Sequence, residues 1–139
     1  MKRQASVVWE GSLQDGRGVI TTESSIFVDD QNFDTRSRAG KGTHAELIAA
    51  AIAVCFTMDL TRQLGQTGLT PERINAAVAV TMQKQPAGST ITTVQLDVLA
   101  RVRGAQQGDF IQAALNAKNR CPISPLLKAT ISMNARLIA

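Results

Sequence analysis

Short apolar runs separated by glycine-rich turns dominate the first thirty residues, a pattern typical of an antiparallel sheet. Ala5–Glu10 and Val19–Thr22 have the composition of strands, and the turn between them falls at Asp15–Gly18. Ser25–Val28 has the composition of a third strand. We therefore predict a meander of three short strands.

Residues 29–43 are polar and end in a glycine-punctuated stretch, Gly40–Thr43. Such composition predicts a loop, and loops often carry functional side chains on a rigid scaffold. This loop would hold Arg36 and Arg38.

A helix is predicted from Ala45, with Thr43 or His44 near its N-cap and Gly65 at its end. From Leu47 to Phe56 the only polar group in it is the thiol of Cys55. A helix that is apolar on all sides is buried on all sides, so in a chain of this size we expect a partner subunit to cover part of it. The run is about half as long as a membrane-spanning helix requires, and we expect no transmembrane segment.

The second half of the chain alternates between strand and helix patterns. Ile74–Gln83 and Ile91–Val102 alternate apolar and polar positions, as half-buried strands do. A second helix follows over Asp109–Asn119, and Ala129–Leu137 forms a last strand. The predicted apolar face of this second helix comprises Phe110, Ile111, Ala114 and Leu115. The order strands, helix, strands, helix, strand predicts an α+β fold in one domain spanning residues 1–139.

Charge and composition narrow the function. The formal net charge is +4 and the sequence pI about 9.6, but no run of five basic residues occurs and only 4% of residues are aromatic. Nucleic-acid binding usually needs clustered cations and stacking aromatics, so we expect no nucleic-acid partner. The N-terminus lacks the apolar core of a secretory signal, so we expect a soluble, cytoplasmic protein without a membrane partner.

The two cysteines are the residues most suited to chemistry. Cys55 and Cys121 lie 66 positions apart, so neither belongs to a CxxC motif. With His44 as the single histidine, a zinc site would need an unusual ligand set, and no metal is expected. Each cysteine could simply fill space in the core as a small apolar residue.

A reactive Cys55 would need a cation beside it, because an apolar environment raises the pKa of a thiol. Arg36 and Arg38 are the candidates, and Glu46, in the first turn of the predicted helix, could pair with an arginine buried there. Cys121 precedes Pro122, which ends a helix or fixes a turn. A second thiol near Cys55 could convert a sulfenic acid into a disulfide.

Several motifs together resemble the OsmC/Ohr family of thiol peroxidases, and the OsmC branch in particular. They are Trp9-Glu10-Gly11, Phe33-Asp34-Thr35-Arg36, Gly40-Lys41-Gly42-Thr43, Glu46–Ala51, Cys55-Phe56-Thr57-Met58 and Cys121–Ala129. The resemblance spans essentially the whole chain, with both cysteine motifs in family order.

The resemblance implies a peroxidase that reduces organic hydroperoxides, and hydrogen peroxide less well, in oxidative or osmotic stress. Cys55 would be the peroxidatic cysteine and Cys121 the resolving one, joined in a disulfide during the cycle. Arg36, held by Glu46, would activate the Cys55 thiolate. The family fold is an intertwined homodimer, with antiparallel sheets wrapped around central helices. No cofactor is implied, but an external dithiol must reduce the disulfide.

One departure from the family pattern concerns Glu46. It lies ten residues after Arg36, as in the OsmC branch, but nine before Cys55 where the family has ten. One residue on a helix corresponds to a rotation of about 100°. We favour Glu46 as the partner of Arg36, and the alternative is a site without that ion pair. The competing function is a non-enzymatic member of the same fold that binds a small hydrophobic ligand.

Overall fold

The computed structural model describes residues 2–12, 15–23, 31–34 and 43–138. The chain divides into two compact units, residues 1–43 and 44–139. The prediction of one domain spanning the chain stays a prediction.

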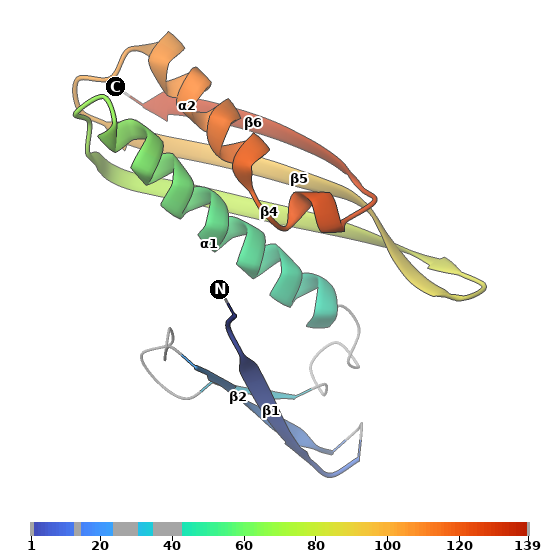
Figure 1. Cartoon of the computed structure of the whole chain (residues 1–139). Helices are drawn as coiled ribbons and strands as arrows, with labels where there is room; N and C mark the ends of the chain where they lie inside the picture. The colour runs from blue at the N-terminus through green and yellow to red at the C-terminus, as the bar shows by residue number, and fades with distance from the viewer. Residues whose placement is uncertain (1, 13–14, 24–30, 35–42, 139) are drawn as a thin grey trace. The chain divides into compact units, whose positions relative to one another are not determined.

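The first unit is a three-stranded antiparallel sheet in the order β1 (Ala5–Glu10), β2 (Arg17–Thr22) and β3 (Gln31–Asp34) (Figure 1). The connection after β1 depends on Gly11, whose φ of 101° lies in the left-handed region. A Cβ on this residue would lie 2.9 Å from the Cα of Gly16, so only glycine fits there without strain.

β3 corrects one prediction, since residues 29–43 were expected to form a loop. Gln31–Asp34 pairs instead with β2, placing Asp34 opposite Arg17. The strand is polar and lies at the edge of the sheet, so backbone pairing determines it and apolar alternation does not reveal it. The strand expected at Ser25–Val28 lies outside the described residues.

The described part of the first unit contains no buried apolar side chain. Val7 and Val8 are neighbours on β1 and point to opposite faces of the sheet, yet they are 54% and 61% exposed. A small sheet without a hydrophobic face packed on another element is at best marginally stable in water. Its stability therefore depends on apolar surface outside the sheet.

The second unit has two helices over one three-stranded sheet (Figure 1). Its elements are α1 (Thr43–Gly65), β4 (Pro71–Gln85), β5 (Gly88–Val102), α2 (Gln107–Arg120), the short 3₁₀ helix η2 (Ser124–Leu126) and β6 (Thr130–Ile138). β4 and β5 form an antiparallel hairpin, whereas β5 and β6 are parallel. α2 is thus the crossover between two parallel strands, which a tight turn could not connect. The predicted α+β class is confirmed.

The core lies between the sheet and the two helices. On β5, alternate residues are buried, from Val94 through Leu96 and Val98 to Ala100. From the helices, Leu60 and Phe110 are among the most deeply buried side chains, both 0% exposed. The period-two alternation identified β4 and β5 in the sequence because one face of each strand packs on this core.

α1 begins two residues earlier than predicted, so Thr43 and His44 belong to its first turn and are not its N-cap. Its buried residues recur every fourth position, Ile52, Phe56, Leu60 and Leu64. The opposite face is apolar too, but Leu47, Val54 and Met58 are 48%, 56% and 68% exposed. The helix is therefore not enclosed on every side by the rest of its own unit.

By length and composition, residues His44–Gly65 would suffice to cross a membrane, with a mean hydropathy of 1.5. The expectation of no such segment rested on the shorter run Leu47–Phe56, whereas the whole helix passes this test of length and composition. The core helix of a soluble protein passes the same test, and one face of α1 packs into the core. The result is thus weak evidence for a membrane location.

Candidate functional site

α1 places Cys55 at the edge of its buried face. Ile52 and Phe56 point into the core, and Cys55 lies beside them, partly buried. Asp59 follows four residues later and is therefore on the same side of the helix, one turn further on. Phe56 is 1% exposed and belongs to the core, whereas Met58 points away from it and is 68% exposed.

α2 delivers Cys121 to the same region. Phe110, Ala113, Ala114 and Ala117 form the buried stripe of this helix, and Cys121 continues the stripe at 4% exposure. Leu115, predicted on the apolar face, is 40% exposed because the buried stripe runs through Ala113, Ala114 and Ala117 instead. The helix ends at Arg120, and Cys121 adopts an extended conformation (φ −61°, ψ 120°), as the residue before a proline usually does.

The two thiols meet. Both cysteines are free, and the side chains of Cys55 and Cys121 share a hydrogen bond. The fold therefore brings together two of the four predicted site residues, from different helices. This contact could not be inferred from composition.

The surroundings of Cys55 keep it protonated. Burial raises the pKa of its thiol to about 11, with further contributions from the hydrogen bond to Cys121 and from the negative charges of Cys121 and Asp59. A thiolate is the nucleophile in cysteine chemistry, so this environment alone does not activate Cys55.

Cys121 is shifted in the opposite direction. Burial acts to raise the pKa of its thiol, but the backbone N–H groups of Ile123 and Ser124, the Ser124 hydroxyl and the Cys55 thiol donate hydrogen bonds that hold it below its usual value. Hydrogen bonds donated to the charged form stabilise it. Of the two thiols, Cys121 therefore loses its proton first.

An ion-pair network lies next to the thiols. Asp59 accepts hydrogen bonds from Arg62 and, at 3.5 Å, from the Nε2 of Gln63, both on α1. Its Oδ1 also lies 3.5 Å from the Nε of Arg120 on α2. Burial acts to raise the pKa of the Asp59 carboxyl, but these partners, Arg62 foremost, hold it below its usual value.

The other predicted site residues are not part of this contact. Arg36 and Arg38 lie outside the described residues. Glu46 is exposed in the first turn of α1, about 13 Å along the helix axis from Cys55 at 1.5 Å per residue. His44 is exposed. In the described part of the chain, no three His, Cys, Asp or Glu side chains are grouped to hold a metal ion.

Asp59, Arg120 and Ser124 were not identified from the sequence. Two signals pointed to them, because Asp59 is one helical turn from Cys55 and Arg120 directly precedes Cys121. Neither signal reveals that the two charges meet, since that depends on how α1 and α2 pack.

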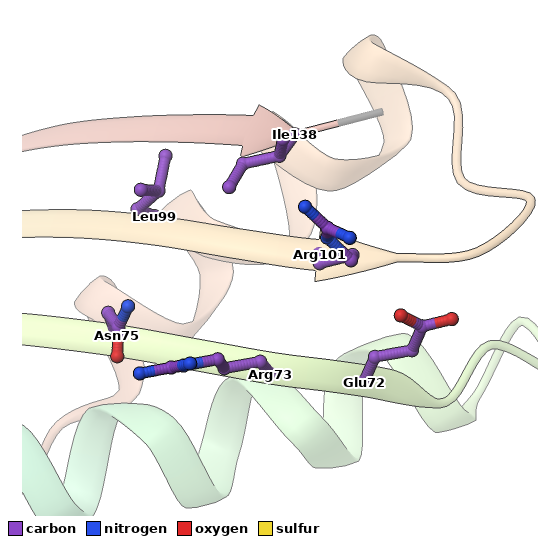
Figure 2. Close-up of a pocket in the computed structure, with 6 residues that line it drawn as sticks. All are labelled: Glu72, Arg73, Asn75, Leu99, Arg101 and Ile138. Carbon is purple, nitrogen blue, oxygen red and sulfur yellow. The ribbon is translucent and has the colours of Figure 1, made fainter.

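A surface pocket lies on the face of the sheet that points away from the helices and from the thiols. Figure 2 shows its lining side chains, Glu72, Arg73, Asn75, Leu99, Arg101 and Ile138. They come from β4, β5 and β6. Except for Glu72, which lies at an irregularity in the register of β4, they alternate with residues packed against the core and so lie on the face away from the helices. The pocket includes neither cysteine.

Comparison with known proteins bears on identity. The family described as OsmC-like protein matches residues 41–136. Peroxiredoxin OsmC of Escherichia coli K12 is 38% identical over 131 residues, 93% of this chain and 92% of the relative. The crystal structure of an OsmC-like protein from Mycoplasma pneumoniae aligns with a TM-score of 0.78 at 15% identity, over 100% of this chain and 99% of that one.

A second solved structure, the organic hydroperoxide resistance protein OhrB of Bacillus subtilis, has a TM-score of 0.64 at 19% identity, over 96% of this chain and 98% of that one. At such identities the structures support the fold. The family match and the Escherichia coli relative support membership, and they confirm the resemblance drawn from the motifs. The chain belongs to the OsmC-like protein family and stands in its OsmC branch.

Proposed function

We propose that this protein is a cysteine-dependent peroxidase that reduces organic hydroperoxides, and hydrogen peroxide less well, in the response to oxidative or osmotic stress. The observation that carries the proposal is the contact between Cys55 and Cys121 across two helices. Its chemistry agrees with the name of the Escherichia coli relative, a peroxiredoxin. It needs no prosthetic group.

The proposed cycle uses two sulfur steps. The Cys55 thiolate attacks the outer oxygen of the hydroperoxide and the O–O bond breaks. Cys55 keeps the hydroxyl group as a sulfenic acid, and the alkoxide takes a proton from water and leaves as the alcohol. The Cys121 thiolate then attacks the Cys55 sulfur, the hydroxyl leaves as water, and a disulfide forms. An external dithiol reduces the disulfide by exchange and is itself oxidised.

The two pKa shifts assign different roles to the thiols. A lowered pKa suits Cys121 as the thiolate that attacks the sulfenic acid. Cys55, whose pKa is raised, needs a nearby cation for the first step. We assign that cation to Arg36, oriented by Glu46, and the assignment rests on the family motif.

The protein works as a homodimer in this proposal. The apolar stripe of α1, Leu47, Val54 and Met58, is left exposed by its own unit, and the first unit leaves apolar surface on β1 exposed. A second copy covering these surfaces would remove them from water. We place the protein in the cytoplasm, soluble and without a membrane or nucleic-acid partner.

Stopped-flow mixing of fully reduced protein with cumene hydroperoxide, followed by intact-mass analysis under thiol-blocking conditions, tests the function. We expect stoichiometric peroxide consumption and loss of two hydrogens per chain, mapped to Cys55 and Cys121. Cys55→Ser should consume no peroxide, and Cys121→Ser should complete one turnover and retain a sulfenic acid that dimedone traps on Cys55.

Peroxide consumption by Cys55→Ser would contradict the assigned mechanism. Unchanged free thiols in the native protein would contradict the function itself, and binding of a small hydrophobic ligand would become the better interpretation.

A further inference from the structure

Asp59 and Arg120 connect the same two helices as the thiols. Asp59 lies one turn after Cys55 on α1, and Arg120 is the last residue of α2, directly before Cys121. The Nε of Arg120 lies 3.5 Å from a carboxylate oxygen of Asp59. The thiol contact and the ion pair thus both join α1 to the C-terminal end of α2. On α1 their residues are one helical turn apart.

The carboxylate is well placed to act as an anchor. The Asp59 side chain is 15% exposed and is also held from its own helix by Arg62 and Gln63. A side chain fixed by its neighbours loses less freedom when it makes another contact. Arg120 is 57% exposed and has no such restraint on its own helix among the described contacts.

The C-terminal end of α2 leads directly into Cys121. After Arg120 the chain leaves the helix at Cys121, and the last carbonyl groups of a helix have no partners within it. Besides its own buried contacts, the position of the Cys121 sulfur depends on what holds this end of the helix against α1.

We propose that the Asp59–Arg120 ion pair positions the end of α2 so that the thiols of Cys55 and Cys121 are in contact before the disulfide closes. The inference rests on the proposed function, in which the Cys121 thiolate displaces hydroxide from the Cys55 sulfenic acid and water is released. Asp59 and Arg120 are positioning residues and take no part in the bond changes. Their effect is on the closing step, because they restrict the reactants to the reactive arrangement.

The chain supplies a matched control. Arg62 pairs with the same carboxylate, and its side chain is similarly exposed at 48%, but it lies on α1 with Asp59. Arg62→Gln removes one positive charge beside Asp59 without cutting a link between helices. Arg120→Gln removes the same charge and the link together.

The test compares closure in these two variants. The reduced proteins are equilibrated with mixtures of oxidised and reduced dithiothreitol, and the Cys55–Cys121 disulfide is quantified by mass after thiol blocking. For Arg120→Gln we expect the equilibrium constant for the disulfide to fall about two- to five-fold, the range that corresponds to an exposed ion pair. Arg62→Gln loosens the anchor but keeps the link between the helices, so it should lower the constant by less than Arg120→Gln does, and Arg120→Lys should recover part of the loss.

A kinetic measurement separates closure from the first oxidation. After a single equivalent of cumene hydroperoxide, the lifetime of the sulfenic acid should lengthen in Arg120→Gln by a similar factor, with peroxide consumption nearly unchanged. Equal behaviour of Arg120→Gln and Arg62→Gln, or of Arg120→Gln and Arg120→Lys, would overturn the positioning role. The dithiothreitol equilibrium needs no peroxide, so it tests this role even if the native protein proves to consume none.

Discussion

At the scale of single residues, the site contains two thiols that share one hydrogen bond and titrate in opposite directions. Cys121 gives up its proton first because backbone and side-chain donors around η2 stabilise its charge. Among the described residues, every group that shifts the pKa of Cys55 raises it. The pair is therefore arranged for the second sulfur step, and the first depends on a cation from elsewhere.

The coupling gives a prediction for Cys121→Ala. Removing the Cys121 sulfur deletes a hydrogen-bond acceptor and a negative charge, both of which raise the pKa of Cys55. We expect the pKa of Cys55 to fall, so that alkylation of Cys55 by iodoacetamide reaches half its maximal rate at a lower pH than in the native protein. Mass analysis of the peptide that contains Cys55 measures this.

The reciprocal variant provides the control. Cys55→Ala removes one of the donors that lower the pKa of Cys121, so alkylation of Cys121 should shift to higher pH. A Cys55 profile that is unchanged or moved to higher pH in Cys121→Ala would contradict the coupling.

The two cysteines could be chosen from the sequence because each opens a family motif and a thiol is the side chain that this chemistry needs. The sequence did not allow their contact, or the ion pair of Asp59 with Arg120, to be predicted. Both depend on the packing angle between α1 and α2, which is set by core side chains many residues away. Glu46 and Arg36 remain predictions from motif and spacing.

At the scale of elements, periodic burial explains which segments were found. β4 and β5 were identified to within a few residues because each buries one face and alternates accordingly. β3 was missed because a polar edge strand carries no such alternation. On α2 the helix was found, but its buried stripe was rotated toward Ala113 and Ala117, since alanines carry little signal about orientation.

The position of Leu115 outside the buried stripe of α2 can be tested by replacing it with alanine and comparing the cost with that of a core leucine. Leu60, 0% exposed on α1, should lose about 2–5 kcal/mol of unfolding free energy on replacement by alanine, because the cavity lies in the core. Leu115→Ala, at 40% exposure on α2, should cost less than about 1 kcal/mol. Urea denaturation of the reduced proteins gives both values, and similar costs would place Leu115 in the core after all.

At the scale of the whole molecule, each of the two units leaves apolar surface of its own uncovered. Val54 and Met58 on α1, and Val7 and Val8 on β1, are all more than half exposed. Exposed apolar surface of this kind marks an interaction site in soluble proteins. The helix predicted to need cover from a partner subunit is thus apolar on a face that the rest of its own unit leaves open.

A charge on this face should prevent assembly. Val54→Asp places a carboxylate where the proposed partner subunit would bury it unpaired, which is costly. We expect the protein to elute as a dimer in size-exclusion chromatography with light scattering and this variant to elute as a monomer. Leu115→Asp, a comparable change at an exposed apolar position of α2, should leave the dimer intact.

A monomeric native protein would contradict the proposed dimer, and so would a Val54→Asp variant that remains dimeric.

The positions of the two thiols have a consequence for the unfolded chain. A bond between Cys55 and Cys121 would enclose β4, β5 and α2 in a covalent ring, with β6 outside it. In the chain-entropy account, a ring of this size restricts the denatured ensemble by about 4 kcal/mol. The oxidised protein should then resist heat and proteolysis better than the reduced one. In each turnover, the segment from Cys55 to Cys121 would be closed into a ring on oxidation and opened again on reduction.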